Sequence, residues 1–165
     1  MPRLLLEAVV ETPSGPLRVM TTHLEYSSGV LRQAQVGGIR EVHRTAYERS
    51  VTSRENGPGT YALFPTSSSA VLTGDFNMRP DDPVKRQISD PFDNGAPALL
   101  DAWQAVHGSQ LHPPSFCLFE QSNGPPHCCD FIFVTEDLAP RIRKVAYDQK
   151  TQASDHQPVL IELNM

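Results

Sequence analysis

The sequence predicts a single α/β domain over residues 1–165, and three observations support this prediction. The chain is long enough to enclose one hydrophobic core. Short apolar, β-branched runs with the alternation of strands are interspersed with one long segment of helical spacing. The chain has fifteen prolines, ten of which cluster at 58–65, 80–97, 113–114 and 125–126, and this predicts long ordered loops and few long helices.

Composition narrows the class of protein. A net charge of −5 argues against extensive sequence-independent binding of nucleic acid, because such binding needs many Lys and Arg side chains. Three cysteines, of which Cys128 and Cys129 are adjacent, do not form a disulfide framework, so we expect a reducing, cytoplasmic compartment. Residues 1–10 have neither the length of a transmembrane segment nor the cleavage site of a signal peptide.

The first element is a predicted β-hairpin. Apolar side chains alternate over residues 4–10, turn residues occupy 12–15, and 17–24 is again extended. His23 falls at the carboxyl end of the second strand, on the face that carries Thr21. A strand-end histidine is either a structural residue or a catalytic one, and the strand pattern alone does not decide between them.

A helix is predicted next, beginning after Ser27 or Ser28 as its cap and running to about Arg49. A loop over 50–69 follows it. The face predicted to pack on the core contains Leu31, Ala34, Gly38, Val42 and Ala46.

A strand over 71–77 then stops at two polar residues. Because side chains alternate along a strand, Asp75 and Asn77 project to one side while Phe76 turns to the core. Gly74 would allow backbone or ligand to approach closely. A carboxylate and an amide at a strand end suit a hard cation or a phosphate, although the same residues also occur in ordinary turns.

Short elements fill the rest of the chain. One helix is predicted over 83–89 with Asp82 as its cap, and another over 98–106. Between and after the proline-rich loops, strands are predicted near 116–119, over 129–134 and over 158–163.

Polar residues recur where these apolar strands begin or end. If the strands are neighbours in one domain, their ends form a rim with three carboxylates, two imidazoles and one amide. Such carboxylates repel unless a cation neutralises them, and all-oxygen ligation favours Mg²⁺ or Mn²⁺. Asp130 lies at the buried end of an apolar strand, so its carboxylate requires a polar or charged partner. The residues are His23, Asp75, Asn77, Asp130, Asp155 and His156.

These motifs resemble the motif series of the endonuclease/exonuclease/phosphatase superfamily, in the same order and over about residues 3–163. Arg32 and Gln35 also look like residues of its bacterial members. The resemblance implies a DNase-like four-layer fold, in which two mostly antiparallel sheets pack face to face with helices outside. The motifs are at 21–24, 74–77, 130–133 and 154–156.

The resemblance also implies roles for individual residues. His156 resembles the general base that activates the attacking water, and Asp130 the carboxylate that fixes its ring and tautomer. Asp155 is similar to a metal ligand. The implied reaction is metal-dependent hydrolysis of a phosphoester by water attack on phosphorus.

The remaining motif residues have implied roles as well. Asp75 and Asn77 resemble the pair that positions water, metal and a phosphoryl oxygen. His23 looks like the histidine that assists the departing group or clamps the phosphate. The implied partner is a phosphoester substrate, such as a nucleic acid, a phospholipid or a small molecule. The loops at 50–69 and 107–127 contain no motif that indicates which of these is bound.

The sequence departs from the family pattern at its start. Family members have an asparagine and a metal-ligating glutamate well before the motif that contains His23, whereas only 22 residues precede it here. We therefore expect the N-terminal portion of the fold to be missing, with weak Mg²⁺ binding and impaired hydrolysis. Uncovered sheet surface then predicts self-association, or pairing with a polypeptide that supplies the missing half.

The sequence leaves two other hypotheses for the function of the chain. The chain is alternatively a non-catalytic binding or assembly domain that retains the phosphoesterase fold. The other is a zinc module, which is disfavoured because adjacent cysteines on a strand point to opposite faces. Its ligands would be Cys117, His127, Cys128 and Cys129.

Overall fold

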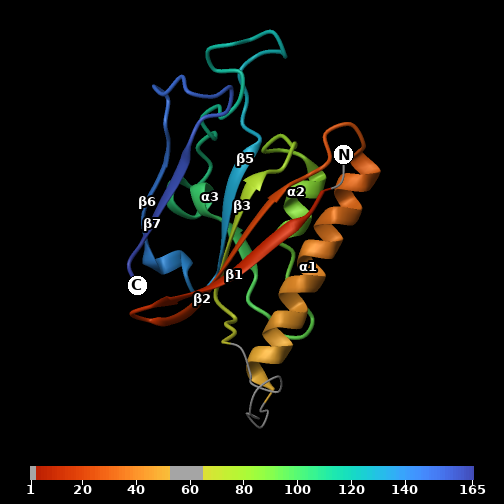
Figure 1. The fold of residues 1–165 in the computed structure, drawn as a ribbon, viewed down its shortest axis with the longest axis vertical. Helices are drawn as coiled ribbons and strands as arrows, with labels where there is room; N and C mark the ends of the chain where they lie inside the picture. Colours follow the sequence, from red (N-terminus) through yellow and green to blue (C-terminus); the bar gives the residue numbers. More distant parts are fainter. Residues whose placement is uncertain (1–2, 53–64) are drawn as a thin grey trace.

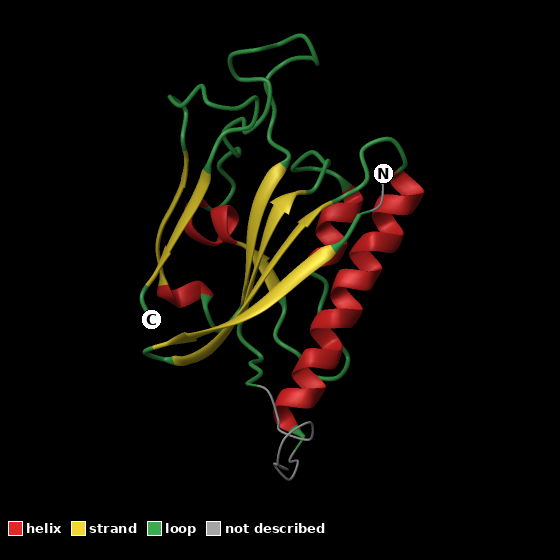
Figure 2. Cartoon of the chain, viewed as in Figure 1, coloured by secondary structure: helices red, strands yellow, loops and turns green. Residues whose placement is uncertain are grey.

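The computed structural model describes residues 3–52 and 65–165 and shows two β-sheets packed face to face, with the long helix on the outer face of the larger sheet (Figures 1 and 2). The larger sheet has five strands in the spatial order β1 (Leu5–Thr12), β2 (Gly15–His23), β3 (Ala70–Asp75), β5 (Asp130–Thr135) and β4 (Leu99–Asp101). The smaller sheet pairs β6 (Ile142–Tyr147) with β7 (Val159–Leu163). The helices are α1 (Gly29–Val51), α2 (Pro83–Ile88) and α3 (Ala102–His107). The predicted α/β arrangement is confirmed.

The two faces of the larger sheet each bury a core. Met20 and Phe133 belong to the cluster that packs under α1 and α2, together with Val36 and Ile88. The opposite cluster joins the larger sheet to β6 and β7 and contains Val71, Ile132, Val134 and Val145. Strand β5 is therefore covered on both faces, as its continuous apolar sequence predicts.

Strand pairing brings the polar strand ends together. Strand β2 runs antiparallel to β1 and parallel to β3, whereas β3 runs antiparallel to β5. The backbones of β2 and β3 approach closely at Gly74, where an added Cβ would lie 1.9 Å from the carbonyl oxygen of Thr22. Gly74 has a φ of +149°, so glycine is required there for both space and conformation.

Helix α2 begins as predicted, with Asp82 accepting a hydrogen bond from the amide of Val84. Helix α1 also forms, but the predicted core face is wrong apart from Ala46, because its apolar residues are spread around the helix and periodicity does not select one stripe. The buried residues of α1 are Val36, Ile39, His43 and Ala46, whereas Leu31, Ala34, Gly38 and Val42 are exposed.

Two other predictions need correction, and one strand was missed. The helix predicted over 98–106 begins only at Ala102, because 99–101 pairs with β5 and Asp101 caps the helix from outside. The strand predicted near 116–119 is reduced to isolated bridges at Phe116, and β6 was not predicted. Most of the loop predicted over 50–69 lies outside the described residues.

A buried charge cluster fixes the start of the long loop before β5. Lys85 Nζ lies 2.6 Å from Asp101 Oδ2, and His112 Nε2 lies 2.9 Å from the same oxygen.

Within the described part of the chain, no helix is long and apolar enough to cross a membrane.

Candidate active site

Three of the predicted site residues form a row across one end of the larger sheet. The parallel pairing of β2 with β3 places His23 opposite Asp75, and the antiparallel pairing of β3 with β5 places Asp75 opposite Asp130. Residues paired in this way project from the same face of a sheet. The sequence motifs from three separate strands therefore converge because of strand register alone.

His156 reaches this row from the loop between β6 and β7. The backbone of Phe116 forms a bridge with His156, and a second bridge with His127 ties both segments together. The ring of Phe116 also lies 4.5 Å from the ring of His156, centroid to centroid. These contacts hold the imidazole against the end of β5.

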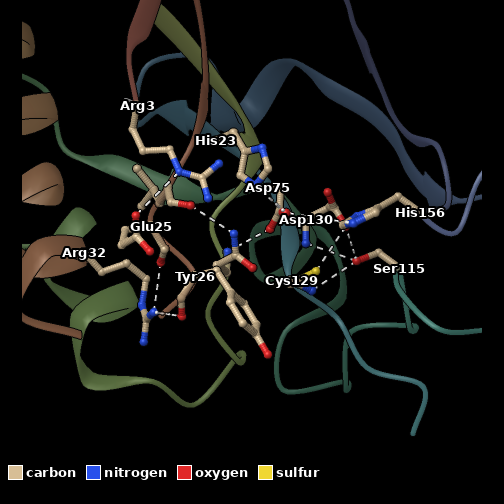
Figure 3. A network of polar contacts seen from close by, with 12 residues as sticks. Arg3, His23, Glu25, Tyr26, Arg32, Asp75, Ser115, Cys129, Asp130 and His156 are labelled. Atoms are coloured by element: carbon tan, nitrogen blue, oxygen red, sulfur yellow. Dashed lines mark hydrogen bonds and ion pairs between the residues drawn. The ribbon is translucent and has the colours of Figure 1, made fainter. Parts of the chain in front are cut away.

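Asp130 is the hub of the hydrogen bonds (Figure 3). Its Oδ2 lies 2.9 Å from His156 Nδ1 and accepts a hydrogen bond of 2.7 Å from the Ser115 hydroxyl. Ser115 Oγ in turn accepts hydrogen bonds from the backbone amides of Cys129 and Asp130, both at 3.1 Å. Because a carboxylate only accepts, His156 Nδ1 carries the proton and, in the neutral ring, Nε2 carries the lone pair.

Asp75 lies between the two histidines. Its Oδ2 is 3.2 Å from His23 Nε2 and 3.9 Å from His156 Nε2. Its Oδ1 accepts a hydrogen bond of 2.8 Å from the amide of Asn77. The Asn77 side chain donates to the carbonyl of Leu24 at 2.9 Å, which ties the end of β3 to the end of β2.

The environment shifts the proton affinities of these groups. Burial raises the pKa of the Asp75 carboxyl, and the neighbouring Asp130 adds to this effect. The hydrogen bond to Asp130 raises the pKa of His156. Burial, with Asp130 and Asp75 close by, raises the pKa of the Cys129 thiol, so Cys129 is a protonated thiol near neutral pH.

The grouped metal-binding atoms differ from the set predicted from the sequence. One ligand atom each of Asp75, Cys129 and His156 lie within 4.8 Å of one another. The carboxylate of Asp155 is not in this group; it is exposed and receives a hydrogen bond of 3.2 Å from the hydroxyl of Ser154. In the described residues, the cluster of four expected for a zinc module with Cys117 is not assembled either.

A cavity of about 430 Å³ opens beside this group. Aromatic rings, polar side chains and one cation line it, which suits a ligand with both flat and charged parts. The lining residues are Tyr26, Asn77, Met78, Arg79, Phe116, Asn123, His127, Cys129 and His156.

The loop that carries Tyr26 is held by residues near the first motif (Figure 3). Arg32 donates to the carbonyl oxygens of Glu25 and Tyr26 at 2.9 and 2.8 Å. Gln35 accepts a hydrogen bond of 2.8 Å from the amide of Glu25. Arg32 and Gln35 thus position one wall of the cavity.

Sequence reasoning missed Ser115, Phe116 and Cys129 as site residues. Ser115 lies in a proline-rich loop without periodicity, and Phe116 begins a predicted strand whose pairing the pattern does not indicate, so neither was placed beside β5. Cys129 was considered only as part of a zinc module with Cys128, yet its position next to Asp130 was a usable signal, because it precedes the first residue of β5.

Comparisons with solved structures identify proteins of similar fold. TDP2 from D. rerio, complexed with single strand DNA product, is 24% identical with a TM-score of 0.60, over 99% of this chain and 62% of that one. An endonuclease/exonuclease/phosphatase from Bacteroides vulgatus is 22% identical with a TM-score of 0.59, over 98% of this chain and 56% of that one. The mannosyl-6-phosphatase of Bacteroides thetaiotaomicron is 17% identical with a TM-score of 0.53, over 91% and 52%.

These likenesses confirm the predicted fold. Neither a protein-family model nor a curated protein matches the sequence. The chain spans less than two thirds of the length of each of these structures. The covered share ranges from 52% of the mannosyl-6-phosphatase to 62% of TDP2.

Proposed function

We propose that this chain, which has the fold of the endonuclease/exonuclease/phosphatase superfamily, hydrolyses phosphoesters by activating a water molecule at His156. One observation carries the proposal: Asp130 lies 2.9 Å from His156 Nδ1, so the neutral ring presents the lone pair of Nε2 beside the cavity. This is the arrangement that a general base requires.

The proposed step moves one proton and exchanges one bond to phosphorus. His156 Nε2 takes a proton from water, and the water oxygen forms a bond to phosphorus as the ester P–O bond breaks. Asp130 stabilises the imidazolium that results. His23, whose Nε2 is 3.2 Å from Asp75 Oδ2, is placed to assist the departing oxygen or to hold the phosphate.

Metal dependence is a further part of the proposal. Asp75 is the carboxylate that would hold Mg²⁺ or Mn²⁺, and the ion would neutralise charge on the phosphoryl oxygens. The described donor set fits this ion only in part, because Asp75 supplies the one oxygen among the three grouped atoms. Water and substrate oxygens would have to complete the shell, so we expect weak binding of Mg²⁺. The exposed Asp155 remains a predicted ligand.

The cavity and the structural neighbours support a proposal for the substrate class. Tyr26 and Phe116 offer aromatic faces, and Arg79 offers a cation to a phosphate. One structure of similar fold holds a single strand DNA product, and another is a mannosyl-6-phosphatase. We infer a phosphomonoester or phosphodiester with a flat or cyclic substituent.

The test is hydrolysis of bis(4-nitrophenyl) phosphate with and without Mg²⁺. We expect slow release of nitrophenol by the wild-type chain and a loss on the order of a hundredfold or more in His156→Ala. Asp93→Asn, which alters an exposed carboxylate elsewhere in the chain, is the matched control and should leave the rate unchanged. Absence of turnover in the wild-type chain would instead favour a non-catalytic domain that binds phosphoesters.

We also propose self-association through β1. Within the described residues this strand is paired along one edge, and its Leu6 and Val10 side chains are 60% and 46% exposed. An apolar groove next to it is lined in part by Leu4, Gly38 and Val42. An unpaired edge beside apolar surface favours strand addition, and a second copy presents the same edge. Light scattering of a monomer at high protein concentration would contradict this.

A further inference from the structure

The donor atoms gathered at the end of β5 belong to three chemical types. Asp75 offers a carboxylate oxygen, Cys129 a sulfur and His156 an imidazole nitrogen, and these atoms lie within 4.8 Å of one another. In residues 3–52 and 65–165 this is the one group of three or more such donors. Cys129 is 3% exposed and lines the cavity, so its sulfur is part of the site wall.

The second observation concerns the orientation of His156. Its Nδ1–H donates to Asp130, which leaves the Nε2 lone pair facing Asp75 Oδ2 at 3.9 Å. With Nε2 deprotonated, the two acceptors that face each other can both bind one cation placed between them. A carboxylate that accepts from the other ring nitrogen is also the usual partner of a metal-bound histidine.

The backing of this histidine is itself fixed. Asp130 is held by the Ser115 hydroxyl, which also binds the amides of Cys129 and Asp130. One buried side chain therefore sets the positions of both the cysteine and the histidine. Such support reduces the reorganisation that metal binding requires.

The kinds of donor select the ion. Mg²⁺ takes oxygen ligands almost alone, whereas Zn²⁺ binds thiolate, imidazole and carboxylate together. A set of three protein ligands with the fourth position open is the arrangement of zinc sites that exchange water or ligands. Here the cavity of about 430 Å³ adjoins the open side.

We propose that Asp75, Cys129 and His156 form a Zn²⁺ site, and that Zn²⁺ bound there blocks hydrolysis. Binding forms a zinc–sulfur bond and releases the thiol proton to solvent. It also occupies the Nε2 lone pair of His156. The inhibitory consequence rests on the proposed function, whereas the binding itself does not.

The test is titration of the chain with Zn²⁺ in competition with a chromophoric chelator. We expect one tightly bound Zn²⁺ per chain in the wild type, and affinity reduced about tenfold or more in Cys129→Ser. Cys128→Ser is the matched control, because the Cys128 sulfur lies 3.7 Å from the Tyr147 hydroxyl rather than in the site. Equal losses in both variants, or no stoichiometric binding, would overturn the proposal.

Cobalt provides a readout that does not depend on the Cys129→Ser variant. Co²⁺ bound through Cys129 gives a thiolate-to-cobalt charge-transfer band in the wild-type chain, and the band should persist in Cys128→Ser. Its absence from the Co²⁺-loaded wild type would refute sulfur ligation even if Cys129→Ser fails to fold.

The two proposals fail separately. Zinc binding at Cys129 without hydrolysis under any metal condition would refute the proposed function alone. Hydrolysis that Zn²⁺ does not inhibit, in a chain without the cobalt band, would refute the zinc site alone.

Discussion

Ser115 is the residue whose loss most directly tests the account of the site's construction. It is fully buried, and its hydroxyl accepts from the amides of Cys129 and Asp130 while donating to the Asp130 carboxylate. In Ser115→Ala the buried amide of Cys129 and the partly buried amide of Asp130 lose this acceptor, and the carboxylate loses one donor. Each unsatisfied buried group costs about 1–3 kcal/mol, and such losses are not additive, so we expect a decrease of about 2–5 kcal/mol in the free energy of unfolding.

Urea denaturation, followed by circular dichroism, measures this change. Ser109→Ala is the matched control, because Ser109 is exposed on the same loop. Ser115→Ala should also slow phosphodiester hydrolysis, since Asp130 would no longer be held toward His156. A loss of stability below about 0.5 kcal/mol, the scale of an ordinary surface substitution, would refute the reasoning.

Three further predictions concern stability and assembly. Gly74→Ala should lower the free energy of unfolding by at least about 2 kcal/mol in urea denaturation, because its Cβ would meet the carbonyl oxygen of Thr22 at 1.9 Å. Gly37 has open space around it, so the control Gly37→Ala should leave stability unchanged or raise it. Equal effects of the two substitutions would contradict this prediction. Burial lowers the pKa of His43 below its ordinary 6.5, so the unfolded chain binds this proton more readily and stability falls as pH falls below 6.5, by at most about 1.4 kcal/mol per pH unit. His43→Gln should flatten that slope, and an unchanged slope would exclude His43 as its source. Leu6→Lys should shift light-scattering mass toward the monomer, and a wild type that is already monomeric at high concentration would refute association through β1.

The neutral state of His43 also follows from hydrogen bonds. Arg18, fully buried, can only donate, and its Nη1 lies 3.1 Å from His43 Nδ1. Nδ1 must therefore accept, and Nε2 donates to the carbonyl of Pro97 at 2.9 Å. Burial is the main reason that the pKa of His43 is lowered, and the positive charge of Arg18, whose contact a second proton on the ring would break, opposes the charged form further.

The sequence pattern was sufficient to place polar residues at the strand ends, whereas their convergence was predicted only on the condition that the strands are neighbours, and the roles of the residues came from the family resemblance. Alternation placed Asp75 on a polar face and Phe76 in the core, and the buried strand that begins at Asp130 required a partner for its carboxylate. The structure supplies that partner in His156, at 2.9 Å. These inferences succeeded because they depend on the two-residue period of strands, which is local.

Features that depend on long loops were not predictable. Ser115 reaches β5 because the loop before it is fixed by the buried contact of His112 with Asp101, and no periodic pattern records a contact of that kind.

The packed face of α1 was also missed, because its apolar residues surround the helix and only the shape of the sheet selects Val36 and Ile39 for burial. Tertiary packing decides in both cases.

The central claim is that Asp130 orients His156 to activate water. The most direct measurement is the rate of phosphodiester hydrolysis by Asp130→Asn, which keeps the size of the side chain and removes its charge. We predict a rate reduced on the order of a hundredfold or more relative to the wild type, with urea denaturation showing a folded chain. A folded Asp130→Asn variant that hydrolyses the substrate at the wild-type rate would contradict the account.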